Sequence, residues 1–94
     1  MTSTREQLDR DTGTGLGAPW HVIVQNDNHN TFEGVASALA AVLPDVSFEL
    51  GLAYATRVHT MGDAVVWSGH LEVAEHYWSG LKRRGLTMAP LERC

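Results

Sequence analysis

The sequence predicts an α+β domain of two layers, in which a three-stranded antiparallel sheet packs on three helices in the order β-α-α-β-α-β. Short β-branched and aromatic runs indicate the strands. Longer stretches with apolar residues every three or four positions indicate the helices. The chain has 94 residues, of which 44% are hydrophobic and 19% charged. This length and composition are typical of one folded domain with a single core.

The chain divides into an arm and a domain. Residues 1–18 are polar and rich in Gly and Thr, so they bury too little apolar surface to offset the entropy lost on ordering. We expect residues 1–18 to form a flexible N-terminal arm and residues 19–94 to form the folded domain.

The first half of the domain predicts a strand followed by a helix. Residues 20–25 read Trp-His-Val-Ile-Val-Gln, a run typical of a strand, and the Asn and Asp residues of 26–30 favour a turn that ends it. Thr31 is a suitable N-cap, and Pro44 ends the helix. The apolar residues between them fall on one helical face: Phe32, Val35, Ala36, Leu39, Val42 and Leu43.

A second helix and a second strand follow. Ser47 is expected to cap a helix that runs to about His59, and Gly62 is expected to end it. Residues 63–67 read Asp-Ala-Val-Val-Trp and predict a short strand.

The last part of the chain predicts a third helix and a third strand. Ser68 is expected to cap the helix, and Gly85 to end it at the C′ position. Residues 86–92 predict a short strand, which Pro90 confines to an edge or an end of the sheet.

Charge and cysteine content argue against several classes of function. The formal net charge is −4, and the basic cluster at residues 82–84 suits the last turn of a helix, so nucleic acid is not an expected partner. The single cysteine is Cys94, which allows no internal disulfide and favours a reducing compartment, so we expect a cytoplasmic protein. No apolar run approaches the roughly 18 residues that span a membrane, so no membrane association is expected.

Catalytic and metal-binding motifs are also missing from the sequence. It has no Ser or Cys placed with a His and an acid in a recognisable motif and no glycine-rich phosphate loop, so we expect neither catalysis nor a cofactor. Glu72, Glu75 and His76 share one helix face, but without further ligands at suitable spacing they predict a solvated surface and no metal site.

Two short polar motifs carry the most functional information. Asn26-Asp27 follows the first strand, and Val58-His59 lies near the end of the second helix. Together they place amides, a carboxylate and an imidazole at the mouth of an apolar groove, which is suitable chemistry for holding a small cation. Taken without context, an Asn-Asp pair after a strand is most often a plain turn, and a histidine near a helix end most often complements the helix dipole.

A family resemblance changes the weight of these motifs. Residues 24–33 read Val-Gln-Asn-Asp-Asn-His-Asn-Thr-Phe-Glu, residues 58–66 read Val-His-Thr-Met-Gly-Asp-Ala-Val-Val, and residues 72–75 read Glu-Val-Ala-Glu. In this order and spacing, the motifs resemble those of the ClpS adaptors, which deliver proteins with destabilising N-terminal residues to a Clp AAA+ unfoldase and its peptidase. The resemblance extends over residues 21–92.

The resemblance implies a binding site for the free α-amino group of an N-degron. Asn26, Asn28 and His59 are the implied partners of the amine, with Asp27 adding negative potential. Many family members have Asp where this chain has Asn28. A carboxylate would bind an ammonium group through a charge-assisted hydrogen bond about twice as strong as a neutral one, so this chain is expected to hold its ligand with less charge.

The resemblance also implies an apolar pocket for the first side chain, which we expect to be Phe, Tyr, Trp or Leu. Family members frequently have Met at the positions of Phe32 and Ala55. The implied pocket residues are Asn30, Phe32, Val35, Ala55 and Val58, with a residue near Thr87 or Met88 closing one wall.

The implied protein partner is a Clp AAA+ unfoldase of ClpA or ClpC type. The family's contact surface maps to His29, Glu72 and Tyr77. Tyr77 stands where the family usually has Lys, which favours a ClpC-type partner. The N-terminal arm fits a segment that the unfoldase engages during delivery, and the adaptor is expected to be a monomer.

Two alternatives stay open. One is a small enzyme that uses His59 as a general base beside Asp27 in the same cleft. The other is a Clp ATPase-docking regulator without N-degron binding. The C-terminal domain of the ribosomal stalk protein shares the predicted topology, but it lacks the Asn-Asp and Val-His pairs.

Overall fold

The strands and helices follow one another in the predicted order. The computed structural model describes residues 18–93, so the predicted arm lies outside the described residues except for Ala18, as does Cys94. The elements are β2 (Trp20–Gln25), α1 (Phe32–Val42), α2 (Phe48–Met61), β3 (Asp63–Gly69), α3 (Leu71–Arg83) and β4 (Glu92–Arg93). The predicted α+β class, with a three-stranded antiparallel sheet and three helices, is confirmed.

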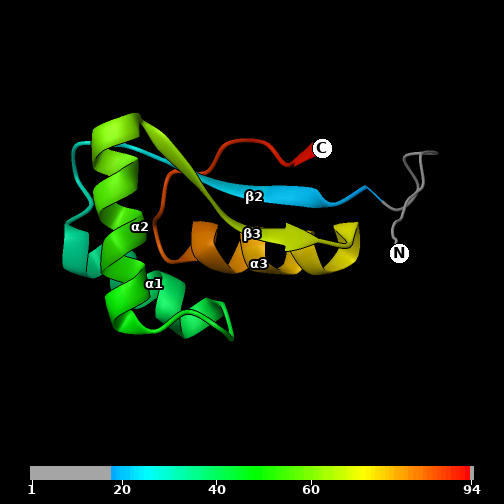
Figure 1. Cartoon of the computed structure of the whole chain (residues 1–94), viewed down its shortest axis with the longest axis horizontal. Helices are drawn as coiled ribbons and strands as arrows, with labels where there is room; N and C mark the ends of the chain where they lie inside the picture. Colours follow the sequence, from blue (N-terminus) through cyan, green and yellow to red (C-terminus); the bar gives the residue numbers. More distant parts are fainter. Residues whose placement is uncertain (1–17, 94) are drawn as a thin grey trace.

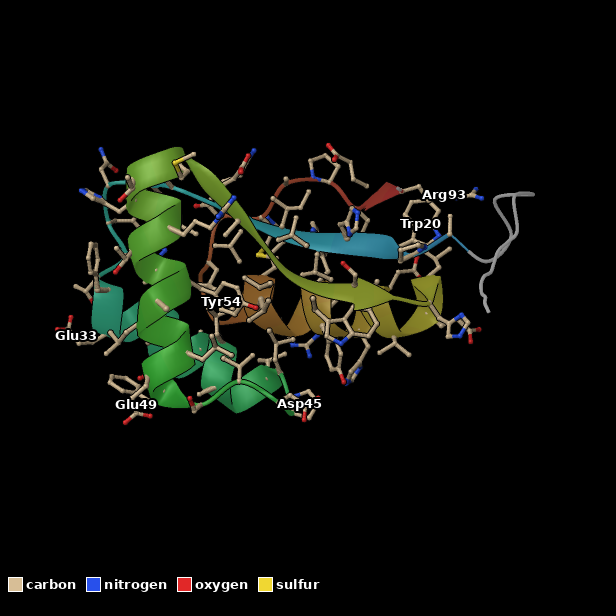
Figure 2. The ribbon with its side chains drawn as sticks, in the orientation of Figure 1. Trp20, Glu33, Asp45, Glu49, Tyr54 and Arg93 are labelled. Atoms are coloured by element: carbon tan, nitrogen blue, oxygen red, sulfur yellow. The ribbon has the colours of Figure 1, made fainter. Side chains whose placement is uncertain are left out.

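The sheet has the strand order β3-β2-β4, with β2 in the centre. Figure 1 shows α3 lying along the sheet, while α1 and α2 gather at one end of it, beside the loop that leaves β2. At the far end of β2, the Arg93 guanidinium lies 5.6 Å from the centre of the Trp20 ring (Figure 2). The helices and the sheet enclose one core, formed by Val22, Val24, Val35, Ala38, Leu39, Leu43, Ala55, Val58, Ala64, Val66, Ala74, Leu81, Leu86 and Met88.

The helix ends follow the capping residues in the sequence. The side chains of Thr31 and Ser47 accept hydrogen bonds from backbone N–H groups three residues further on, which satisfies donors that a helix start leaves free. Gly62 and Gly85 follow α2 and α3 with positive φ angles of 95° and 92°, a conformation that glycine adopts without strain. The two glycines fix where α2 and α3 stop, and so where the chain segments after them begin.

Two boundaries differ from the prediction. Ser68 does not cap α3: it lies in β3, paired with His21 of β2, and its Oγ is 2.6 Å from His21 Nδ1. Pairing with β2 therefore extends the strand to Gly69, and the N-cap position of α3 falls to His70, whose side chain makes no capping bond. The second helix also continues past His59, to Met61.

The predicted strand over residues 86–92 forms only in part. Met88 makes a single bridge to Val24, and a continuous strand is restricted to Glu92–Arg93. Pro90 lies between these two contacts and has no backbone N–H to donate to the sheet. None of the helices described is long and apolar enough to cross a membrane.

Candidate functional site

A small pocket opens where the loop after β2, the start of α1, the end of α2 and the segment after α3 meet. It encloses about 40 Å³. Its apolar floor consists of core side chains from the two helices, including Val35, Ala55 and Val58, each less than 10% exposed. The residues that line it are Val24, Gln25, Asn26, Asp27, Asn30, Phe32, Val35, Ala55, Val58, His59, Leu86 and Thr87.

Asp27 organises the loop that forms the polar side of this pocket. Its Oδ1 accepts hydrogen bonds from the backbone N–H groups of His29 (3.1 Å) and Asn30 (2.8 Å). Its Oδ2 accepts from Asn30 Nδ2 (2.7 Å) and Thr87 Oγ1 (2.8 Å). Both carboxylate oxygens are therefore already engaged by the protein itself.

These bonds also determine the charge of Asp27. Its side chain is only 12% exposed, and burial alone would raise its pKa, but the hydrogen bonds from Asn30, Thr87 and His29 outweigh burial and hold the pKa of this carboxyl well below its usual range. The carboxylate is therefore ionised at neutral pH. It supplies a fixed negative charge beside the pocket while its oxygens hold the loop in place.

Further hydrogen bonds tie the loop to both neighbouring segments. Asn30 Nδ2 also donates to the carbonyl oxygen of Gly85, at 2.9 Å. The backbone N–H of Asn26 donates to Gly62 O at 2.9 Å, and that of Gln25 to Thr87 O at 2.8 Å. The loop after β2 is thus attached to the end of α2 and to the chain that follows α3.

The side chains of Asn26, Asn28 and His59 differ from that of Asp27. All three are exposed, and within residues 18–93 they take part in no side-chain hydrogen bond. The His59 ring contacts the Phe32 ring, with 5.3 Å between ring centres and 60° between ring planes. The amide oxygen of Asn26 and a ring nitrogen of His59 are therefore available at the mouth of the pocket to accept hydrogen bonds from a donor, and Asn28 offers a further amide oxygen on the adjoining loop.

The structure brings together most of the residues singled out in the sequence, but not all. Asn28 lies on the loop without lining the pocket, and Met88 is buried beside Val24. Three lining residues were missed: Val24, Gln25 and Leu86. Leu86 had a usable signal, because it follows the Gly85 that ends α3, and the residue after such a glycine commonly makes an apolar contact. Its N–H donates to Leu81 O, as that motif requires.

The residues predicted to contact an unfoldase lie in two separate places. His29 is on the loop, next to Asn30, which contacts the chain just after α3. Glu72 is exposed in the first turn of α3, so the length of this 13-residue helix, about 20 Å, separates the two sites. Tyr77 is half-buried, with its ring edge-on to Trp67 at 5.0 Å. They do not form one cluster.

Metal-binding side chains do not gather within residues 18–93. No group of three or more His, Cys, Asp or Glu side chains in that range could hold a metal ion.

Comparison with known proteins places the chain in a family. Residues 17–92 match the family model described as ATP-dependent Clp protease adaptor protein ClpS. This chain belongs to the ClpS family. ClpS proteins are adaptors of the Clp protease and are not catalytic, so the predicted family and the absence of enzymatic activity are both confirmed, and the alternative of a small acid-base enzyme is set aside.

Individual ClpS proteins resemble the chain over most of its length. The ClpS of Nostoc sp. is 47% identical over 73 residues, which cover 78% of this chain and 75% of the relative. That of Thermosynechococcus vestitus is 45% identical over 73 residues, covering 78% of each. The structure of Agrobacterium tumefaciens ClpS2 bound to L-phenylalaninamide superposes with a TM-score of 0.74 at 25% identity, covering 83% of this chain and 99% of the other.

Proposed function

We propose that this ClpS adaptor binds the free α-amino group and the bulky first side chain of N-degron proteins and delivers them to a Clp AAA+ unfoldase in the cytoplasm. The observation that carries the proposal is the position of uncommitted polar groups, Asn26 and His59, on the rim of a pocket with an apolar floor. L-Phenylalaninamide, the ligand of A. tumefaciens ClpS2, has a free amine, a benzyl side chain and an amide in place of a carboxylate. It therefore resembles the first residue of a peptide chain.

In this proposal, three acceptors from the loop after β2 and from α2 hold the amine. An ammonium group has three N–H donors, and Asn26 Oδ1, Asn28 Oδ1 and a neutral His59 ring nitrogen supply three acceptors. Asp27 contributes through its charge, because its oxygens already accept bonds from Asn30, Thr87 and His29. A negative potential without a direct carboxylate contact favours a cation while leaving the loop intact.

The first side chain enters the apolar part of the pocket. Val35 of α1 and Ala55 and Val58 of α2 line the pocket, together with Phe32, Asn30 and Thr87. Met88, which the resemblance placed in this wall, supports it from the core. An apolar floor under a polar rim selects for Phe, Tyr, Trp or Leu at a free chain terminus.

Delivery requires a second surface for the unfoldase. The exposed residues His29 and Glu72, together with the half-buried Tyr77, are the proposed contacts with a ClpA-type or ClpC-type partner, and residues 1–18 are the proposed segment that the partner engages. Degradation of a Phe-initiated reporter with each unfoldase in turn, in the presence of the full chain or of residues 19–94, tests which partner is served and whether the arm is needed.

Fluorescence anisotropy with peptides that differ only in their first residue tests recognition. We expect Phe, Tyr, Trp and Leu peptides to bind, Ala and Ser peptides to bind much more weakly, and N-terminal acetylation to abolish binding. His59→Ala should weaken binding by about tenfold, the effect of losing one hydrogen bond to a charged group. His76→Ala, at an exposed histidine of α3 outside the pocket, is the matched control. Equal affinity for free and acetylated peptides would contradict N-degron recognition and favour the alternative of a regulator that docks on the ATPase without binding N-degrons.

A further inference from the structure

An open cavity of about 430 Å³ lies between the end of α1 and the second half of α3. It shares no residue with the pocket described above. The lining residues are Ala41, Val42, His76, Gly80, Arg83 and Arg84, so no Asp or Glu of residues 18–93 lines it. In a chain with a formal net charge of −4, a cavity whose permanent charges are all positive favours an anionic ligand.

The positive charge exceeds what the two helix ends require. His76, Gly80 and Arg84 are spaced four residues apart, and Arg83 precedes the last of them, so all four share one face of α3. The helix α1 ends at Val42 and α3 at Arg83, and each helix C-terminus is equivalent to about half a negative charge. Two guanidinium groups therefore leave a net charge of about +1 at the cavity.

Both guanidinium groups lack a partner in the part of the chain that the structure describes. Within residues 18–93, the exposed side chains of Arg83 and Arg84 take part in no hydrogen bond or ion pair. The His76 ring contacts the Tyr77 ring, with 5.9 Å between ring centres, and makes no hydrogen bond in the same range. A guanidinium presents a planar fork of N–H donors that matches the oxygens of a carboxylate or a phosphate. The cavity thus combines uncommitted donors with positive charge.

Gly80 keeps the space between the two helices open. A Cβ at this position would lie 3.2 Å from Val42 Cγ1, so a side chain longer than that of Ala would fill the floor of the cavity. Gly80 does not have the positive φ angle found at Gly62 and Gly85, and glycine is, after proline, the residue least suited to a helix interior. The open space is therefore a reason for glycine here that the backbone conformation does not supply.

We propose that this cavity binds a phosphate-type oxyanion, either inorganic phosphate or the phosphoryl group of a phosphomonoester. A phosphomonoester has three strongly accepting oxygens and nearly two negative charges at neutral pH. Arg83 and Arg84 can each donate two hydrogen bonds to such a group, and the His76 ring N–H is a further donor. A carboxylate has two oxygens and one charge, which a single guanidinium already satisfies.

The proposed anion site is separate from the proposed N-degron pocket. Phe32 at the pocket and Val42 at the cavity are the two ends of α1, about 15 Å apart at 1.5 Å per residue. Both sites can therefore be occupied in one molecule, and the anion site does not depend on N-degron binding.

Titration of the ¹⁵N-labelled full chain with inorganic phosphate tests the site. Amide NMR spectra are recorded at constant ionic strength, with chloride replacing phosphate in the reference series. We expect saturable shifts of the N–H signals of His76, Gly80, Arg83 and Arg84, with half-saturation at about 1–10 mM, the weak end of specific affinities. Shifts that do not saturate, or that chloride reproduces, would mean general attraction of anions and would overturn the proposal.

Substitutions assign the binding to the cavity. Arg83→Gln and Arg84→Gln should each weaken phosphate binding by about tenfold, the effect of losing a hydrogen bond to a charged group. Arg84→Lys keeps the charge but not the fork, so it should have an intermediate effect. Lys82→Gln is the matched control, because Lys82 is exposed and adjacent to Arg83 but does not line the cavity. It should change the affinity by less than twofold. Equal losses in Lys82→Gln and the arginine variants would contradict a site in the cavity.

A phosphoserine peptide with an acetylated N-terminus distinguishes the two sources of the anion. If it shifts the same signals at lower concentration than inorganic phosphate, and its unphosphorylated counterpart does not, the ligand is a phosphomonoester. If it binds no more tightly than inorganic phosphate, the site is one for the free ion. The absence of shifts in α3 with both probes would refute the anion site while leaving the proposed N-degron function untouched.

Discussion

Thr87 Oγ1 donates a 2.8 Å hydrogen bond to Asp27 Oδ2 and so joins two residues that lie 60 positions apart in the chain. The bond connects the loop after β2 to the segment after α3, on one side of the pocket. A carboxylate oxygen that accepts from a neutral hydroxyl forms a charge-assisted bond, which is stronger than a bond between neutral groups. Thr87 therefore stabilises the loop on which Asn26 and Asn28 are carried.

Replacing Thr87 by Val tests this contribution, because Val keeps the shape of the side chain and removes its donor. Asp27 Oδ2 then keeps a single bond, from Asn30 Nδ2. We expect the free energy of unfolding to fall by about 1–2 kcal/mol, in the range for hydrogen bonds to charged groups at a site that water can partly reach. Urea unfolding followed by tryptophan fluorescence measures the change. Thr56→Val is the control: its hydroxyl donates to Leu52 O on an exposed helix face, so its loss should cost less than 0.5 kcal/mol, about the limit for surface substitutions.

The ionised Asp27 also predicts how stability depends on pH. The folded-state pKa of this carboxyl is well below its usual range, while an unfolded Asp titrates at about 3.9. The folded state therefore binds fewer protons, so the stabilisation is fully present above about pH 4 and is lost as the pH falls toward the folded pKa. Asp27→Asn should destabilise the domain by about 1–3 kcal/mol at pH 7, because one amide N–H₂ would then face donors.

Urea unfolding at pH 7 and at pH 3 distinguishes this account from a general effect of charge. The difference in the free energy of unfolding between wild type and Asp27→Asn should be smaller at pH 3 than at pH 7. Asp45, an exposed residue in the turn between α1 and α2 (Figure 2), provides the control, and Asp45→Asn should change stability little at either pH. If wild type is more stable than Asp27→Asn by the same amount at pH 3 as at pH 7, the ionised Asp27 carboxylate is not the source of the stabilisation.

The fold could be predicted largely because its boundaries depend on local chemistry. Thr31 and Ser47 cap helices, and Gly62 ends one, through bonds to residues no more than four positions away. Ser68 failed as a predicted cap because a distant partner, His21 on β2, recruits it into the sheet. Capping preference is a local property, whereas strand pairing is a tertiary one and takes precedence here.

Prediction of the site was limited in the same way, by contacts between residues far apart in the chain. The sequence could not assign the oxygens of Asp27 to Asn30 and Thr87, because one of these partners lies 60 positions away. It also left open whether Thr87 or Met88 closes one wall of the pocket. Adjacent residues in an extended segment point to opposite sides, and the structure places Thr87 at the pocket and Met88 in the core. The binding roles of the pocket residues remain predictions.

The contact between Gly51 and Ala36 sets the spacing of the two helices that form the pocket floor. A Cβ on Gly51 would lie 2.7 Å from Ala36 O and 2.8 Å from Ala36 Cα, and backbone atoms cannot easily move aside. Gly51→Ala should therefore force α1 and α2 apart and destabilise the domain by about 1–3 kcal/mol, despite a helix-propensity gain of up to about 1 kcal/mol.

The wider spacing should also enlarge the pocket between Val35 and Ala55, so the preference for a first-residue Trp over Leu should increase in Gly51→Ala. Thermal unfolding and peptide anisotropy measure the two effects. Gly80→Ala is the control, because Gly80 is also inside a helix but its nearest neighbour is the Val42 side chain, at 3.2 Å. We expect it to change stability by less than about 1 kcal/mol and to leave the preference unaltered. Equal effects of the two substitutions would contradict the spacing argument.

Asn28 offers a way to strengthen the proposed amine contact. Its side chain is exposed and, within residues 18–93, makes no hydrogen bond, so Asn28→Asp adds a carboxylate without breaking a contact. An exposed ion pair is worth about 0.2–1 kcal/mol, which predicts about 1.4-fold to fivefold tighter binding of a peptide with a free N-terminal Phe.

This gain should disappear for the acetylated peptide, which has no ammonium group, and should shrink in about 1 M salt, where the Debye length is about 3 Å. Ser37→Asp adds the same charge at an exposed position of α1 that does not line the pocket and should leave affinity nearly unchanged. If both substitutions tighten binding equally, the effect comes from net charge and Asn28 is not a partner of the amine. If Asn28→Asp alone tightens binding, and only for free N-termini, the loop carries an amine-binding position that this chain leaves uncharged.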